Sequence, residues 1–473
     1  MLKLIIHKEI HSNLLNLRFL ATTIISLVLI LSSIMILTET YEAEWRDYQN
    51  RVQTQDEFMD QFGHSNRAGW MGRQMRPPSP FRIFVVGIDQ EADQNNFISN
   101  PVPVLFTSID FVGIITIIMS LVAILFSFNA ISGEREAGVL RQMLSTGVAR
   151  RTIIWGKFVG GNISLIIPFT VGVLGGLLYL LLSARIQFRL TDYAVILILV
   201  ITAWLYISGF FALGLLFSIR SRSSNQALLK SLFAWVVIVL VWPNVTPFIA
   251  AQIYRIPSAA KIEQQRAYLT SDERDEILRK RGREMLQTQF PDIAKIMQRE
   301  RNEVDGIIKS DPRLTQQYSA YTQAHDALVQ EVNREQNEKA NKISEVFFER
   351  SRNQEDLAIT LACFSPYSNV LFAATNITEA GIQGETHWRR QASEYQGIFH
   401  NYVETRYQEA KELNPTFGYN DYLDLRGRPR FHYQPQDLSE RISQSLLHFG
   451  AIALFVILSI SIALVSFFKY DVR

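Results

Sequence analysis

Residues 19–37 have the sequence FLATTIISLVLILSSIMIL, which contains no charged side chain. A helix needs about 20 mainly apolar residues to cross the hydrocarbon core of a bilayer, and this run is long enough. Basic residues precede it, as in a secretory signal, but its apolar core is longer than a signal peptide's and no Ala-x-Ala-like cleavage site follows. The run therefore predicts an uncleaved first membrane span.

Five further runs share this character. Together with the first they predict six spans, at residues 19–38, 105–131, 153–182, 192–219, 228–250 and 446–468. Backbone amides cannot stay unpaired in lipid, so each run should be a continuous helix or be shielded by its neighbours. The third run contains a proline and several glycines, which predict a kink and close helix approach rather than a missing span. These residues are Pro168, Gly160, Gly161, Gly172, Gly175 and Gly176.

Charged residues are distributed unevenly. They make up 19% of the chain, yet they are nearly missing from the six runs and dense between residues 259 and 355. Because a soluble protein needs a polar face on every surface helix, this segregation predicts an all-α polytopic membrane protein with solvated regions. The net charge of +2 provides no basic footprint for nucleic acid. Cys363 is the single cysteine and cannot form an internal disulfide.

Basic residues in short loops predict the orientation of the chain. They are frequent in residues 1–18, 132–152, 220–227 and 469–473, whereas the short loop 183–191 holds Arg185 and Arg189. The first group of segments, and with it both termini, is therefore expected in the cytoplasm. Residues 1–18 carry apolar side chains at helical spacing and predict an amphipathic helix at the inner membrane surface. The alternative is a frayed start of the first span.

Two regions are expected outside the cytoplasm. The smaller, 39–104, begins with a polar helical continuation (39–61) and contains Phe81–Val86, which predicts a short strand. The larger, 251–445, is predicted to be mainly helical. Its charged stretch 259–355 predicts two or three long helices in a hairpin, punctuated by Pro291 and Asp311-Pro312. Residues 359–382 are apolar but too rich in polar side chains for a span. They predict an amphipathic helix packed at the outer membrane surface, with a re-entrant helix as the alternative.

No residue pattern indicates chemistry in the chain itself. A phosphate-binding Gly-x-x-x-x-Gly-Lys-Ser/Thr loop is missing from the sequence, since Gly147 and Gly156-Lys157 have the wrong spacing. His7 and His11 stand one helical turn apart without an evident third ligand, so we predict no metal site. Asp110 and His448 lie near span ends and are interpreted as interfacial rather than as a proton relay. We therefore predict no catalytic residues.

The first long inner loop, 132–152, carries the most informative segment. Residues Glu134–Leu144 predict one rigid amphipathic helix, which is followed by the pair Arg150-Arg151. Its apolar edge could fit a partner's groove while its charges fix the register; this edge comprises Val139, Leu140, Met143 and Leu144. The residues alone leave open the alternative of an ordinary solvated loop.

This loop resembles that of the ABC-2-type permeases, the membrane subunits of ATP-binding-cassette exporters. The stretch Ile131–Ser145, with Arg150-Arg151 and Gly156-Lys157, is similar to their GE(R/K)E-x-G-T-L signature, although Val139 stands where threonine is common. The resemblance covers the six-span frame, about half of the chain. Pro78-Ser79-Pro80 and Ser365-Pro366 are also similar to a bacterial group of copper-maturation and gliding-motility permeases.

The resemblance implies a fold like that of a type V ABC exporter, with the large outer domain between spans five and six. It implies that the loop docks a separate ATPase subunit, which binds ATP and magnesium, while this chain needs no cofactor. The implied coupling residues are Glu134, Arg135, Glu136, Val139, Leu140, Arg141, Met143, Leu144, Arg150 and Arg151, with a second contact at Arg220, Arg222 and Asn225.

Further partners follow from the same resemblance. A second permease, identical or paralogous, would complete the transporter in the bacterial inner membrane, and the outer domain could contact an envelope partner. The function implied is that of an exporter permease. The alternative is an ATP-driven mechanotransmission or scaffold protein that transports nothing.

Overall fold

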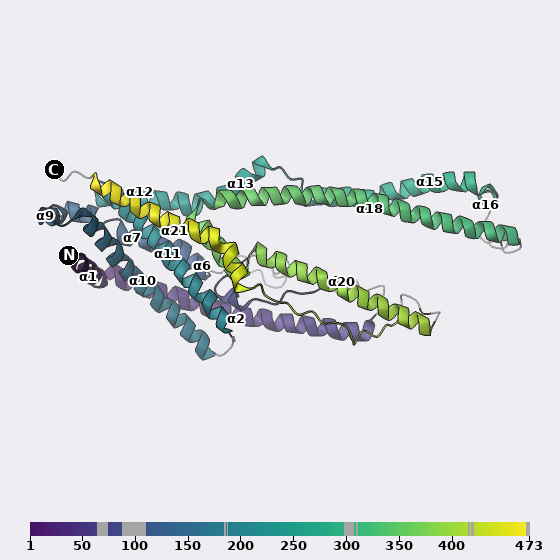
Figure 1. Cartoon of the computed structure of the whole chain (residues 1–473), viewed down its shortest axis with the longest axis horizontal. Coiled ribbons are helices and arrows are strands. Elements are labelled where there is room, and N and C mark those ends of the chain that lie inside the picture. Colours follow the sequence, from purple (N-terminus) through teal and green to yellow (C-terminus); the bar gives the residue numbers. More distant parts are fainter. Residues whose placement is uncertain are drawn as a thin grey trace. The chain divides into compact units, whose positions relative to one another are not determined.

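The computed structural model describes residues 1–63, 74–87, 110–183, 186, 188–297, 307–308, 311–414, 417 and 421–469 (Figure 1). The chain forms two compact units, one of residues 1–243 and 362–473 and one of residues 244–361. We call them unit 1 and unit 2. All long regular elements in the described ranges are helices. The expected outer domain 251–445 is thus shared between the two units.

Six helices in the described residues are long and apolar enough to cross a membrane, as the sequence predicted. They are Leu17–Phe62, Phe111–Glu136, Arg150–Ser183, Leu190–Arg220, Ser224–Ile253 and Leu438–Phe468. The first is α2 (Leu17–Phe62), a single helix of 46 residues that contains both the predicted span and its polar continuation. A separate helix, α1 (Leu2–Leu14), precedes it, and Asn16 caps α2 in an extended conformation. Residues 2–14 therefore form a helix of their own rather than a frayed start of the first span.

The second and fifth spans each contain a π-helical segment. The second comprises α6 (Phe111–Gly113), η3 (Ile114–Met119) and α7 (Ser120–Ser127), and the fifth comprises α12 (Ser224–Trp235), η4 (Val236–Val241) and α13 (Trp242–Ile253). Carbonyl groups in both π-helices accept side-chain hydrogen bonds, Thr116 from Tyr206 (3.0 Å) and Ile238 from Ser365 (2.7 Å). These bonds satisfy polar backbone groups that lipid could not.

Glycines on the third span, α10 (Arg150–Ser183), allow this helix to approach its neighbours closely. A Cβ at Gly172 would lie 2.9 Å from Ile30 of α2, and one at Gly161 would overlap Phe211 of α11 (Leu190–Arg220). The helix runs without interruption through Pro168. The predicted close approach is confirmed at these positions, because only glycine leaves room for the facing side chain.

The predicted strand Phe81–Val86 is wrong. Pro80–Ile83 form a short 3₁₀-helix, η2, in which Pro80 takes the first position and Ser79 accepts a hydrogen bond from the Phe81 amide. Phe81, Ile83, Phe84 and Val85 are all buried in the core of unit 1. Asp110, which caps α6, also accepts a hydrogen bond from the Val86 amide at 3.2 Å. The apolar run 81–86 thus reflects burial in the helical core rather than pairing in a sheet.

The segment 359–382 contains a helix of only 12 residues, α19 (Pro366–Ile377), which is capped by Ser365. It is too short to cross a bilayer. Most of its residues are buried, and it packs against α11 and the sixth span, α21 (Leu438–Phe468). The segment is thus embedded among the apolar helices of unit 1.

In unit 1, α2 extends beyond its apolar part beside α20 (Ile382–Leu413) (Figure 1). Met59 of α2 shares a small core with Tyr395 and Phe399 of α20. Arg428, in the segment that leads to α21, forms ion pairs with Asp56 and Asp60 of α2. The Arg428 side chain is only 3% exposed, so these carboxylates neutralise a buried charge.

Unit 2 is a helical hairpin, as the sequence predicted for this stretch. One arm comprises α14 (Ala259–Tyr268), η5 (Leu269–Glu273) and α15 (Arg274–Gln289); the other is α18 (Pro312–Ala362), a helix of 51 residues. Arg281 pairs with Glu335 and Lys339 with Glu273 across the hairpin. Between the arms lies α16 (Pro291–Ile296), so Pro291 and Pro312 each begin a helix.

Candidate functional site

The predicted rod Glu134–Leu144 is two helices. α8 (Ser132–Glu136) and α9 (Val139–Ser145) are separated at Ala137-Gly138. Gly138 has a φ of 72°, a left-handed conformation that costs glycine little and other residues more. The Ala137 and Gly138 amides bond back to the Gly133 and Arg135 carbonyls, which closes α8. The expectation of one rigid helix over Glu134–Leu144 is therefore wrong.

Glu134 of α8 binds Lys157 of α10. The Lys157 Nζ lies 2.9 Å from Glu134 Oε1 and 2.9 Å from Glu9 Oε1, and the lysine side chain is 2% exposed. Lys8 adds a longer contact of 3.6 Å to Glu134. A buried ammonium group needs such partners, because its desolvation without them would cost on the order of several kcal/mol. This cluster joins α8, α10 and α1.

The N-terminal helix α1 packs on the first turns of α10. A Cβ at Gly156 would lie 2.5 Å from Ile5, and one at Gly160 would lie 2.8 Å from the Glu9 Cβ. The two glycines are four residues apart and so face the same side of α10. They allow α1 to approach closely enough for Glu9 to reach Lys157. This contact was not predicted from the sequence, in which its only signal is a lysine near the start of an apolar run.

Arg135 and Glu136 bind helix ends. The Arg135 guanidinium donates to the carbonyls of Ile219 (3.0 Å) and Ser221 (2.5 Å), where α11 ends. The Glu136 carboxylate accepts from the Ser224 amide (2.9 Å) and hydroxyl (2.7 Å), where α12 begins. A cation at a helix C-terminus and an anion at an N-terminus both complement the helix dipole. The two motif charges thus fix the α11–α12 turn against α8.

Serine hydroxyls complete this contact. Ser218 Oγ accepts hydrogen bonds from the Ile131 and Ser132 amides, both at 3.0 Å. Ser132 Oγ lies 3.2 Å from both Ser218 Oγ and Ser224 Oγ. The amides at the start of α8 are therefore satisfied by α11, which gives the loop a defined position.

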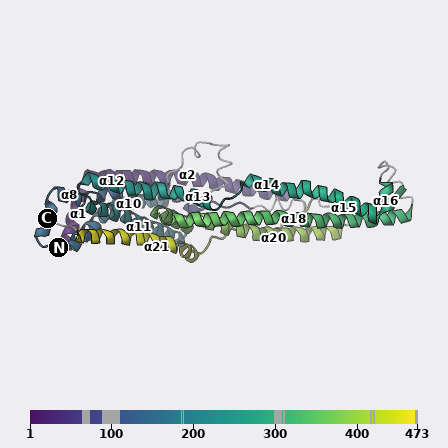
Figure 2. The same ribbon diagram turned by 90° about the horizontal axis from the view of Figure 1, so that it is seen from above.

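Two further arginines bind carbonyls at helix ends. Arg150 donates to the Phe468 carbonyl at 2.6 Å, at the end of α21. Arg18 donates to the Leu125 carbonyl at 3.3 Å, near the end of α7. We call the end of unit 1 that carries α8, α9 and the α11–α12 turn the loop end; Figure 2 shows α1, α8 and α12 there.

The apolar edge of α9 faces the chain's own core. Leu140 is 2% exposed, and Met143 and Leu144 pack against the same core. Arg141 and Gln142 are exposed. The structure therefore does not present the predicted apolar edge to a partner. What α9 presents is a polar face.

The structure brings the predicted second contact next to the first. Arg220, Arg222 and Asn225 are exposed on the α11–α12 turn, which Arg135 and Glu136 bind. Arg151 is exposed one residue after Arg150. The candidate residues thus divide into two groups: some hold helix ends together, and others point to solvent.

Within the described ranges, no three His, Cys, Asp or Glu side chains are placed to hold a metal ion. Cys363 Sγ lies 3.8 Å from His448 Nδ1, and Asn369 Oδ1 lies 3.0 Å from the same nitrogen. Because both groups compete for one ring nitrogen, the histidine cannot relay a proton between them. The contact is structural.

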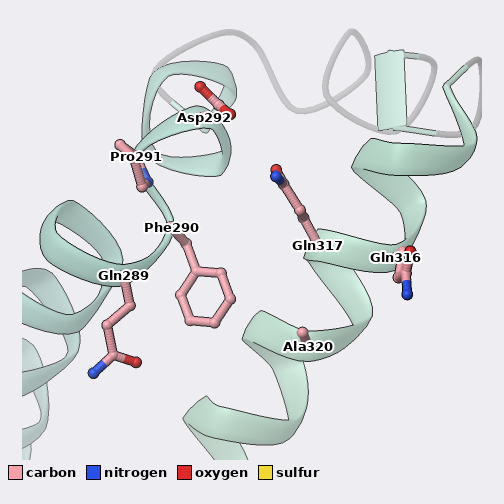
Figure 3. Close-up of a pocket in the computed structure, with 7 residues that line it drawn as sticks. All are labelled: Gln289, Phe290, Pro291, Asp292, Gln316, Gln317 and Ala320. Carbon is pink, nitrogen blue, oxygen red and sulfur yellow. The ribbon is translucent and has the colours of Figure 1, made fainter.

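Unit 2 has an open cleft of about 310 Å³ at the α15–α16 junction. Phe290 and Gln317 point into the space between the helices, and Asp292 lies above them (Figure 3).

Comparison with known proteins gave one family match. The sequence model of a family described as "ABC-2 family transporter protein" matches residues 4–472. A search of curated proteins found no match to the chain. The family match includes both units and the loop end.

Proposed function

The chain belongs to the ABC-2 family of transporter proteins, and on that premise we propose that it is the permease of an exporter driven by a separate ATPase subunit at the loop end. Members of this family carry no ATPase domain of their own, so the membership implies an ATPase partner. The chain is a multi-pass membrane component of such a transporter. The role of the loop end, the direction of transport and the topology are our proposal.

The observation that carries the proposal is the buried cluster of Lys157, Glu134 and Glu9. It connects α8, the start of α10 and the N-terminal helix in one network. A partner that moves α8–α9 would therefore move the third span as well. ATP binding needs only to favour one of two arrangements of these helices for the change to reach the membrane.

The proposal assigns different tasks to the predicted coupling residues. Glu134, Arg135 and Glu136 position the loop, because their side chains bind the chain's own helices. Arg141 and Gln142 on α9 and the exposed Arg222 contact the ATPase subunit. A second permease copy or paralogue completes the transporter, and both termini lie in the bacterial cytoplasm.

Co-purification tests the partner. The tagged chain, extracted in mild detergent from its native membrane, is expected to retain an ATPase subunit in a fixed ratio. Full function of the purified chain with no ATPase bound would contradict the proposal. Leu140→Ala should lower the thermal unfolding temperature but leave the ATPase contact intact, since that side chain is in the core rather than at the surface.

Cysteine labelling tests the topology. In a Cys363→Ser background, Asn337→Cys on α18 should react with a membrane-impermeant thiol reagent in intact cells, and Ser145→Cys on α9 only after lysis. Both positions are exposed, whereas the neighbouring Gln336 is 1% exposed and would not report on sidedness. The reverse labelling pattern would contradict the orientation.

One observation favours the second candidate, mechanotransmission without transport. α2 is continuous from Arg18, which binds the Leu125 carbonyl, to Asp56 and Asp60, which bind Arg428. A rigid helix anchored at both ends could carry motion across the membrane. Whether α7 and α12 move apart during the ATP cycle distinguishes the exporter from the mechanotransmission protein, because an exporter must open a path through the spans.

Trp235 Nε1 donates to Ser120 Oγ at 2.8 Å, where α12 meets α7. A short bifunctional thiol reagent joining Ser120→Cys and Trp235→Cys tests this contact. For an exporter, the yield should fall when the assembled complex is trapped with ATP and vanadate. An unchanged yield would favour mechanotransmission.

The copper-maturation and gliding-motility likeness remains part of the proposal. Its two motifs both begin helices, because Ser79 caps η2 and Ser365 caps α19. A helix cap of this kind is a local structural feature. We therefore use the likeness only to choose which cargo to test.

A further inference from the structure

All acidic side chains in the described part of the loop end are bound within the chain. Glu9 and Glu134 bind Lys157, and Glu136 binds Ser224. The Lys157 cation therefore compensates the first two carboxylates, and both oxygens of the exposed Glu136 carboxylate accept hydrogen bonds from Ser224 at the N-terminus of α12.

Except for Glu136, whose carboxylate is bound by Ser224, the exposed charged side chains of α8, α9, the α11–α12 turn and the first turn of α10 are arginines. Arg141 lies on α9, Arg151 on the first turn of α10, and Arg220 and Arg222 flank the α11–α12 turn. Arg135 and Arg150 instead donate to helix-end carbonyls. The exposed cations thus sit on neighbouring elements that the structure holds together. We call these four exposed residues the arginine face.

The apolar side of α9 cannot supply the contact. Leu140 is buried, and Met143 and Leu144 pack on the core. A helix that binds a membrane surface inserts its apolar side into the lipid, but α9 has turned that side inward. By contrast, α1 exposes Leu4 to 68%. The helix suited to lipid is therefore α1, and α9 is suited to a polar protein surface.

We infer that the arginine face docks on an acidic surface of the ATPase subunit, and that charge, rather than apolar packing, provides the recognition. This inference rests on the proposed function. Guanidinium groups bind carboxylates through two parallel hydrogen bonds, which lysine cannot do. Complementary charge also steers association and makes it sensitive to ionic strength.

The test uses the detergent-solubilised complex of the full chain with its ATPase subunit. Charge reversal by Arg141→Glu with Arg151→Glu should weaken retention of the ATPase by about tenfold or more, because like charges would then meet across the contact. Neutral Arg141→Gln with Arg151→Gln should give a smaller loss and a shallower salt dependence. Arg350→Glu with Arg352→Glu, exposed on α18, makes the same net-charge change and should have no effect.

Salt provides the second measurement. Retention by the wild-type chain should fall as the salt concentration rises from 0.1 M to 1 M, since the screening length shrinks from about 10 Å to about 3 Å. Retention that changes neither with salt nor in the Glu and Gln double variants of Arg141 and Arg151 would overturn the acidic-surface inference. The proposal of an ATPase partner would still stand. Failure of the wild-type chain to retain any ATPase would instead contradict the proposed function. Loss of binding to phosphatidylglycerol vesicles with normal ATPase retention would assign the face to lipid and also overturn the inference.

Discussion

The ammonium group of Lys157 lies 2.9 Å from the Glu134 carboxylate, and the lysine side chain is 2% exposed. Removing one partner of a buried ion pair leaves the other charge unpaired, at a cost of about 3–5 kcal/mol. We therefore expect Lys157→Gln to produce a clear fall in the thermal unfolding temperature of the detergent-solubilised chain. Lys8→Gln is the control, because its side chain is 55% exposed and exposed pairs contribute about 0–1 kcal/mol. Equal, small effects of both substitutions would show that the cluster does not hold the loop.

The approach of α1 to α10 depends on glycine. Gly160→Leu should displace α1, because even a Cβ there would lie 2.8 Å from the Glu9 Cβ. Cross-linking between Ile6→Cys and a cysteine on α10 should then fall. Gly282→Ala on α15 is the matched control: nothing lies within 4 Å of its Cβ position, and alanine in a helix should stabilise by about 0.5–1 kcal/mol. Undiminished cross-linking in the leucine variant would refute the close contact.

Gln336 is buried in unit 2, and both amide atoms of its side chain lack a hydrogen-bond partner. An unsatisfied buried polar group costs about 1–3 kcal/mol. Gln336→Leu should therefore slow hydrogen exchange of the α18 backbone in the full chain. Asn337→Leu, on the exposed side, should leave exchange unchanged. Faster exchange in Gln336→Leu would mean that the glutamine makes a stabilising contact.

Burial raises the pKa of Glu379, which is 5% exposed and accepts a hydrogen bond from the Gln436 amide. A carboxyl group whose folded-state pKa is raised binds its proton more tightly when folded. Its contribution to stability is then lost as pH rises from its unfolded pKa through its folded pKa. Glu379→Gln should flatten the dependence of the unfolding temperature on pH above about 4.5, with no loss at neutral pH. A large loss at neutral pH would mean that the charged form is required.

The sequence predicted features that depend on local composition. Runs such as 19–37 are apolar for their full length, so the six candidate spans could be read directly. The hairpin arms were visible because proline fits the first turn of a helix and not its interior, and Pro291 and Pro312 each begin a helix. Ser365-Pro366 likewise opens a helix. These signals lie within a few residues of the structure that they determine.

Features that depend on distant contacts were not predictable. Glu9 and Lys157 are separated by 148 positions, and nothing near either residue indicates the other. The break at Gly138 depends on a backbone conformation that glycine permits but does not require. The burial of Leu140 depends on the core that the spans form together. The error at Phe81–Val86 has the same origin, since its apolar residues are buried by helices rather than by a sheet.

The most direct measurement is site-specific photocross-linking from α9 in native membranes. A photoreactive residue at Gln142, which is exposed, should cross-link to an ATPase subunit, and the same residue at Gln354 on α18 should not. The account predicts one adduct of ATPase size from Gln142 that is sensitive to salt. Cross-links from Gln142 to lipid alone, or an ATPase adduct from Gln354 only, would contradict it.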